Sequence, residues 1–262
     1  MNKKKLIPII FLAIGVIMIL ISVIFHPPIG RGPLVGRDFE VDSFTGVNIG
    51  GSYQVIWRES EEFAVRVETQ ENLFRNLSVT VENDTLRIRQ NRGFQLVSFG
   101  STRPSRIYIY SPSLASAHFS GSVRTENWDP IEGDAFSLQS SGAATIDLVV
   151  NTDELNVNTS GSARVTIEAN VNTLNIDSSG AGTFTLAGTT NTLDISISGS
   201  GRVHAQDLQA TSANITISGA GNADVTVSDY LDVRISGSGR VTYEGMPRVA
   251  QSISGAGRVT QR

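Results

Sequence analysis

Cysteine is absent from this chain of 262 residues, and lysine is confined to positions 3 to 5. The lack of cysteine excludes disulfides, thiolate metal sites, cysteine nucleophiles and a lipid-modified cysteine anchor. Beyond the three lysines, 18 arginines stand against 25 acidic residues. We therefore expect no binding to nucleic acid in general, because such binding depends on many basic contacts with phosphates.

Histidine is also scarce. The three histidines, His26, His118 and His204, are far apart and match no metal-ligand spacing. The glycine-rich segments lead into strand-like segments and not into a helix N-terminus, so they are unsuited to cradling a phosphate. The sequence therefore predicts neither a metal nor a cofactor.

The N-terminus combines basic residues with a long apolar run. Residues 6–25 are twenty positions broken only by single proline, glycine and serine residues, directly after the lysines. As a helix, this run spans about 30 Å, the thickness of a bilayer core. We expect residues 1–26 to be an uncleaved anchor, with the lysines in the cytoplasm and the rest on the extracytoplasmic side of a bacterial membrane. A cleaved signal peptide and a buried core helix are the competing interpretations.

The next two segments differ in composition. Residues 27–38 are rich in proline, glycine and arginine, which predicts a short extended tether. In residues 39–119, short segments such as 53–57, 64–68 and 107–110 alternate apolar with polar residues, as half-buried strands do. We interpret 39–119 as a strand-rich cap region.

A Ser-Gly motif recurs eight times in residues 120–262. Successive glycines of the motif are 21, 19, 19, 19, 20, 18 and 18 residues apart. Such a period in a strand-rich chain indicates one supersecondary unit per repeat, each stacked on the next. We call these residues the corner glycines: Gly121, Gly142, Gly161, Gly180, Gly199, Gly219, Gly237 and Gly255.

The residues around the corner glycines predict the form of the repeat. Apolar residues lie six and four positions before most of them, with a polar residue between, as at Leu174, Asn175 and Ile176. Another apolar residue, such as Phe184, lies four positions after the glycine. This pattern favours two or three short strands per coil of a parallel β-helix, with coils about 4.8 Å apart. Glycine suits the corner because stacked corners leave no room for side chains.

Basic residues recur with twice this period. Corner glycines of alternate coils are followed three positions later by Arg124, Arg164, Arg202 and Arg240. The coils between them have threonine or asparagine there, until Arg258 breaks the alternation. Arginines in adjacent coils would repel each other by roughly 0.9 kcal/mol in water, so the alternation reduces the charge repulsion along the column. The stripe is either a binding site for an anionic polymer, such as a teichoic acid, an acidic glycan or lipid headgroups, or a solvated face that resists aggregation.

The run Gly50-Gly51-Ser52, the segment 106–110 that leads into Pro112-Ser113-Leu114, and the repeated coils form a recognisable set. Together they resemble the auto-transporter adhesin head GIN domain family over roughly residues 40 to 260. The resemblance implies a right-handed β-helix on the bacterial surface or in the periplasm, with no catalytic residues to assign. No translocator barrel or wall-sorting tail follows Arg262, so we do not expect autotransport in the strict sense.

A catalytic interpretation depends on Asp194 and Asp232, which the repeat places in one column, two coils or about 9.6 Å apart. That distance is close to the carboxylate separation of inverting glycosidases. However, Asn214 lies between them and Asn156 and Asn175 continue the column, which favours a structural asparagine ladder.

Aromatic residues are concentrated before and just after the first corner glycine. Trp57, Trp128, Tyr110, Phe94 and Phe99 would form either a sugar-binding patch or a cap over an open end of the β-helix.

We thus expect a non-catalytic, membrane-anchored envelope protein whose all-β solenoid serves adhesion or binds a cell-surface polymer, glycan or partner. Two alternatives stay open. The first is an accessory regulator of envelope stress that acts through membrane partners, and the second is a carbohydrate-active β-helix enzyme.

Overall fold

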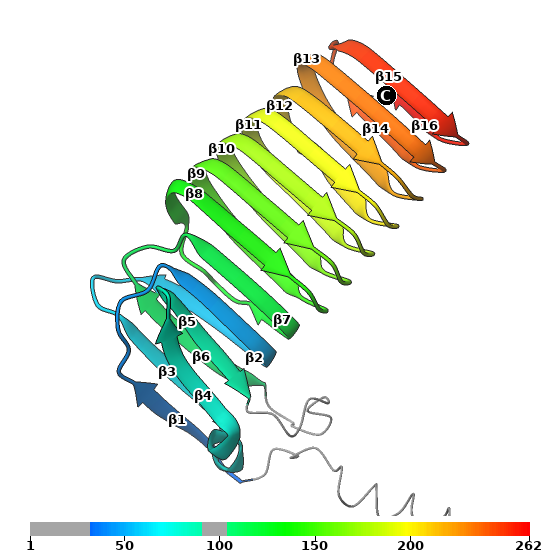
Figure 1. Cartoon of the computed structure of the whole chain (residues 1–262). Helices are drawn as coiled ribbons and strands as arrows, with labels where there is room; N and C mark the ends of the chain where they lie inside the picture. Colours follow the sequence, from blue (N-terminus) through cyan, green and yellow to red (C-terminus); the bar gives the residue numbers. More distant parts are fainter. Residues whose placement is uncertain (1–31, 91–103) are drawn as a thin grey trace, which may run out of the picture.

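A computed structural model describes residues 32–90 and 104–262 of the protein. Figure 1 shows a column of stacked coils that extends to the C-terminus, with a smaller group of strands at its N-terminal end. In the described part of the chain, one short 3-10 helix, η1 (Glu71–Asn76), interrupts the strands. The prediction of an all-β parallel solenoid of the right-handed type is confirmed.

Each regular coil is one long strand that bends near its middle. In β10 (Arg164–Ser178), residues 164–171 form a first leg and residues 173–178 a second leg, and the ladder to the next coil skips Asn172 at the bend. Buried and solvent-facing positions alternate along both legs, so every second side chain points inward. There are thus two legs per coil. The other coils of this form are β9 (Thr145–Thr159), β11 (Thr183–Ile197), β12 (Arg202–Ile217) and β13 (Asn222–Gly237).

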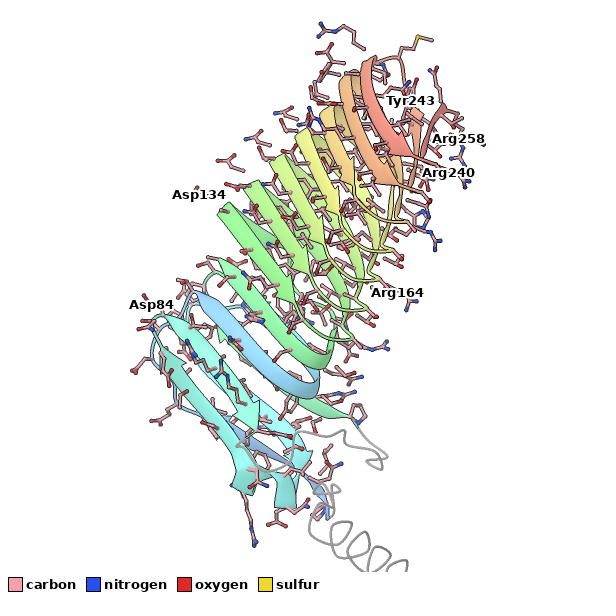
Figure 2. The ribbon with its side chains drawn as sticks, turned by 45° about the vertical axis from the view of Figure 1, so that its right-hand side comes forward. Asp84, Asp134, Arg164, Arg240, Tyr243 and Arg258 are labelled. Carbon is pink, nitrogen blue, oxygen red and sulfur yellow. The ribbon has the colours of Figure 1, made fainter. Side chains whose placement is uncertain are left out.

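Parallel pairing brings equivalent residues of successive coils into columns. Leu155, Leu174 and Leu193 are direct ladder partners and are fully buried. Similar inward columns from both legs fill the space between them, while the alternate side chains project outward (Figure 2). Because burial of one leucine side chain contributes about 1.5–3 kcal/mol, the repeated inward columns hold the stack together.

The coils begin before the sequence repeats do. β2 (Gly46–Glu59) pairs in parallel with β7 (Ser116–Thr125) over ten positions, and β8 (Ile131–Ser140) pairs with both β7 and β9. On its other edge, β2 pairs in parallel with β5 (Thr85–Gln90) and β6 (Ser105–Ser111). The sequence predicted that the coils begin at residue 120. That residue is only where the sequence repeats begin, because β2 already belongs to the stack. The last strands are β14 (Arg240–Glu244), β15 (Arg248–Gly255) and β16 (Arg258–Gln261).

Antiparallel strands occupy the N-terminal end of the stack. β3 (Ala64–Gln70) pairs with β1 (Leu34–Phe39) and with β6, and β4 (Leu77–Glu82) pairs with β5. The tether predicted over residues 27–38 therefore needs correction, because its last five residues belong to β1. Alternating apolar residues were too few there to reveal the strand.

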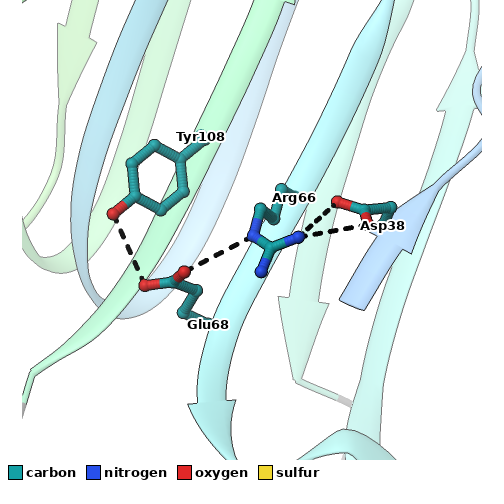
Figure 3. A network of polar contacts seen from close by, with 4 residues as sticks. All are labelled: Asp38, Arg66, Glu68 and Tyr108. Carbon is teal, nitrogen blue, oxygen red and sulfur yellow. Dashed lines mark hydrogen bonds and ion pairs between the residues drawn. The ribbon is translucent and has the colours of Figure 1, made fainter. Parts of the chain in front are cut away.

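Polar contacts hold β1 against β3 (Figure 3). Nη1 of Arg66 in β3 donates to both carboxylate oxygens of Asp38 in β1, each at 3.1 Å. Glu68 accepts from Nε of Arg66 and from the hydroxyl of Tyr108 in β6, each at 3.4 Å. The hydrogen bond with Asp38 is the main cause that raises the pKa of Arg66. The network thus links three neighbouring strands at the N-terminal end.

The anchor predicted over residues 6–25 lies outside the described residues. Within 32–90 and 104–262, no helix is long and apolar enough to cross a membrane.

Candidate functional site

The corner glycines stack along one edge of the coils. Gly237 and Gly255 are direct ladder partners, and a Cβ added to Gly255 would lie 2.5 Å from the carbonyl oxygen of Gly237. The same collision with the preceding corner occurs at all eight positions. Gly51 of β2 is a further member of the column, beneath Gly121. The repeat spacing missed it because seventy residues separate the two glycines in sequence.

A polar groove follows the serine side of this corner. It has a volume of about 360 Å³ and extends from His118 of β7 to Ser198 after β11. Three buried hydroxyl residues, Ser140, Thr159 and Ser178, are part of its lining. Within the described residues, Oγ of Ser140 has no hydrogen-bond partner. The groove offers hydroxyl and amide groups for hydrogen bonding, and its charged lining is limited to Asp177 and, when protonated, His118.

On the other side of the corner, the first legs carry the predicted arginines in one column. Arg164 has Thr145 and Thr183 as its two ladder neighbours, and Arg202 follows Thr183. Gln54 is the ladder partner of both Arg124 and Arg106, so Arg106 joins the same column. The sequence pattern had not connected Arg106 with these arginines. We call the basic members the arginine column. In ladder order the positions are Arg106, Gln54, Arg124, Thr145, Arg164, Thr183, Arg202, Asn222, Arg240 and Arg258.

The members of the arginine column from Arg124 to Arg258 are exposed, whereas Arg106 is half-buried, donates to Gln54 and has Glu68 as its other ladder neighbour. Arg124, Arg164, Arg202 and Arg240 are all exposed, and none of them has an ion pair with any described residue. Arg164, Arg240 and Arg258 project from the same side of the coils (Figure 2). Their guanidinium groups are therefore available to an external anion.

Acidic side chains limit the width of this positive strip. Asp147 and Asp224 lie on the same legs, two residues beyond Thr145 and Asn222. A strand rises about 3.3 Å per residue, so these carboxylates are about 6.6 Å from the column along the strand. Asp224 also lies 3.4 Å from Nδ1 of His204. The positive potential is therefore confined to the column itself.

In the column of Asp194 and Asp232, side-chain hydrogen bonds join two pairs of neighbouring coils, while Asp232 pairs with Arg234 of its own strand. Asn214 lies between the two aspartates and donates to Asp194 at 2.6 Å, and Asn175 donates to Asn156 at 2.8 Å. Asp194 thus accepts from a structural amide, and neither aspartate lines the groove at His118 or the groove at Asn172. Among residues 32–90 and 104–262, no three histidine or acidic side chains are grouped to hold a metal. This geometry favours the ladder over the catalytic interpretation.

The two tryptophans lie inside the stack. Trp57 and Trp128 are 2% and 9% exposed, their rings are 6.0 Å apart, and Phe119 packs edge-on against Trp128. The indole nitrogen of Trp128 donates to the carbonyl of Val55 at 2.8 Å. A sugar-binding patch on these tryptophans is therefore wrong, because their faces are covered. Tyr110 is half-buried on β6, whereas Phe94 and Phe99 lie outside the described residues.

Comparisons with known proteins agree with this architecture. The family described as "Putative auto-transporter adhesin, head GIN domain" matches residues 43–247. A structure described as a "putative lipid binding protein" from Parabacteroides distasonis ATCC 8503 is 25% identical, with a TM-score of 0.80 over 89% of this chain and 98% of that one. A "putative adhesin" from Parabacteroides merdae ATCC 43184 is 23% identical, with the same TM-score and coverage. No curated protein matches the chain.

Proposed function

Because the chain belongs to the auto-transporter adhesin head GIN domain family, we propose that it is a non-catalytic binding protein of the bacterial envelope. Its solenoid holds an anionic cell-surface polymer along the arginine column. The observation that carries this proposal is the row of exposed arginines, four of which lack an ion pair within the described residues.

A row of charges suits a polymer better than a small ligand. One exposed ion pair contributes only about 0.2–1 kcal/mol, so a single arginine holds an anion weakly. Several arginines that engage one chain act together, because the first contact raises the effective concentration of the next anionic group. The net negative charge of the protein does not prevent this, since salt screens charges beyond about 8 Å at physiological ionic strength.

We also propose that residues 6–25 anchor the solenoid in the cytoplasmic membrane, with the arginine column on the extracytoplasmic side. Mass spectrometry of the membrane fraction should then recover peptides from residues 6–25. A mature protein that starts near His26 would replace the anchor by a cleaved signal peptide.

The polymer proposal is tested by retention of the solenoid on immobilised polyanions, hyaluronan and polygalacturonate, at rising salt. The triple variant R164Q/R202Q/R240Q should lose retention while its melting temperature stays unchanged. A matched control, R75Q/R89Q/R234Q, removes three exposed arginines from other elements and should keep it. Equal retention of both folded variants would refute the arginine column as a binding site.

Lipid headgroups share this chemistry, and one relative is described as lipid binding. Anionic phospholipid vesicles therefore form a second arm of the test. Vesicle binding that depends on the column, without retention on either polysaccharide, would assign the site to headgroups instead of a polymer.

A further inference from the structure

The arginine column has a period of two strands, whereas the coils themselves repeat at every strand. From Arg106 to Arg240, each arginine is separated from the next by one uncharged residue: Gln54, Thr145, Thr183 or Asn222. Neighbouring strands lie about 4.8 Å apart, so the charges recur about every 9.6 Å. This spacing includes Arg106, which comes from outside the repeats, and so it is a property of the folded ladder.

The spacing makes each arginine a separate electrostatic site. The separation of the charges, about 9.6 Å, exceeds the screening length of about 8 Å at physiological salt. The column therefore acts as a row of distinct sites and not as a continuous positive band. A ligand with the same charge spacing can engage every site at once. If the charges of a ligand are more closely spaced, some of its anionic groups lie between two arginines.

The strands between the arginines disfavour anions at two positions. Asp147 lies two residues beyond Thr145, and Asp224 lies two residues beyond Asn222. Two positions beyond Arg164, Arg202 and Arg240 the residues are Thr166, His204 and Thr242, and Arg124 is the exception, with Glu126 two positions beyond it. An anionic group placed on a strand between two arginines therefore meets a carboxylate at these positions instead of a cation. Threonine, asparagine and glutamine on these strands can still hydrogen-bond to neutral hydroxyl groups.

We propose that the arginine column selects a linear polysaccharide that carries one anionic group on every second sugar. One pyranose unit of a linear chain is about as long as one strand spacing, which is about 4.8 Å. A disaccharide therefore roughly matches one period of the column. The charged sugar lies at an arginine and the neutral sugar lies at the uncharged strand. This inference rests on the proposed function and adds the charge pattern of the polymer.

The test compares two carboxylated polysaccharides of different charge spacing. Hyaluronan carries one carboxylate on every second sugar, and polygalacturonate carries one on every sugar. The variant R124T/T145R/R202N/N222R moves two arginines to neighbouring strands without changing the net charge. The control R124K/R202K keeps both charge and spacing at the same positions. Melting temperatures verify that both variants are folded.

The unmodified protein should bind hyaluronan oligosaccharides more tightly than polygalacturonate oligosaccharides of equal length. The rearranged variant should lose about tenfold in hyaluronan affinity, because two charge contacts worth roughly twofold to fivefold each are out of register. The lysine control should lose much less. If the unmodified protein binds hyaluronan and polygalacturonate equally tightly, and the rearranged variant binds them as tightly as the unmodified protein does, the spacing inference is overturned and the polymer proposal stays intact. If the unmodified protein binds neither polymer, both proposals fail.

Discussion

Arg106 donates a hydrogen bond of 3.0 Å from Nε to Oε1 of Gln54, across two strands whose partners are 52 residues apart in sequence. Gln54 is in turn the ladder partner of Arg124. The arginine column therefore continues without a break from the repeated coils into the N-terminal region. If the column is one binding site, Arg106 forms its N-terminal end, half-buried and next to Glu68.

Replacement of Arg106 by glutamine should weaken retention on a polyanion by roughly twofold, the low end for one charge contact, because Arg106 is half-buried and lies next to Glu68. Arg124→Gln, at an exposed position, should have a larger effect of up to about fivefold. Arg89→Gln serves as the control, because Arg89 is exposed on β5, whose residues pair with the other half of β2. Oligosaccharide titrations would measure all three. An Arg106 variant that binds like the unmodified protein would restrict the site to the repeated coils.

Replacement of Thr183 by arginine should destabilise the protein in low salt. The new guanidinium would be flanked by Arg164 and Arg202, its ladder neighbours. Each pair of charges about 4.8 Å apart repels by roughly 0.9 kcal/mol in water, so we expect a loss of about 1–2 kcal/mol. The loss should shrink in 1 M salt, where the screening length is about 3 Å.

Thr185→Arg is the matched control for that experiment, since Thr185 lies on the same strand between Thr166 and His204. Denaturant unfolding at two salt concentrations would measure both variants. A salt-independent loss at Thr183, or an equal loss at Thr185, would contradict charge repulsion as the reason for the alternation.

Replacement of Gly199 by alanine should destabilise the coil stack by about 1–3 kcal/mol, the usual effect of overpacking. The added Cβ would collide with the backbone carbonyl of Gly180, which neighbouring coils hold in place. Gly36→Ala is the control, because the three atoms nearest to its added Cβ belong to the side chain of Arg66, whose displacement would weaken only the exposed contacts with Asp38 and Glu68. Thermal unfolding should separate the two variants, and equal shifts would argue against rigid stacked corners.

The buried hydroxyl of Tyr53 leads us to expect a loss of protein stability at high pH. Burial raises the pKa of its hydroxyl from 10.0 to about 12, against the opposing effect of a hydrogen bond with Gln90. The folded state keeps the proton of Tyr53 to a higher pH than the unfolded state does. The contribution of this protonated hydroxyl to the free energy of unfolding is therefore complete below pH 10 and is lost as the pH rises towards 12. The free energy of unfolding should fall by about 3 kcal/mol over this range.

Tyr53→Phe isolates this effect, because the variant has no proton to lose at that position. The difference in unfolding free energy between the protein and the variant should change between pH 10 and pH 12. A difference that stays constant with pH would show that the buried hydroxyl does not titrate in this way.

The repeated part of this protein could be predicted from the order of its amino acids. The spacing of the corner glycines, the inward residues such as Leu174 and Phe184, and the alternation of Arg164 with Thr183 are all local to one coil or to adjacent coils. When each coil stacks on the next one in sequence, a period along the chain becomes a column in space, so these columns could be predicted.

The first coils, by contrast, depend on strand pairings that became visible only in the fold. β2 lies between β6 and β7, which places Gly51 beneath Gly121 and Gln54 between Arg106 and Arg124. These neighbours come from segments with no common period, so no spacing in the sequence connects them. The same strand order covers Trp57 and Trp128, whose aromatic character alone did not distinguish a core from a binding patch. Long-range strand pairing depends on the summed burial of whole segments, and single residues therefore do not reveal it.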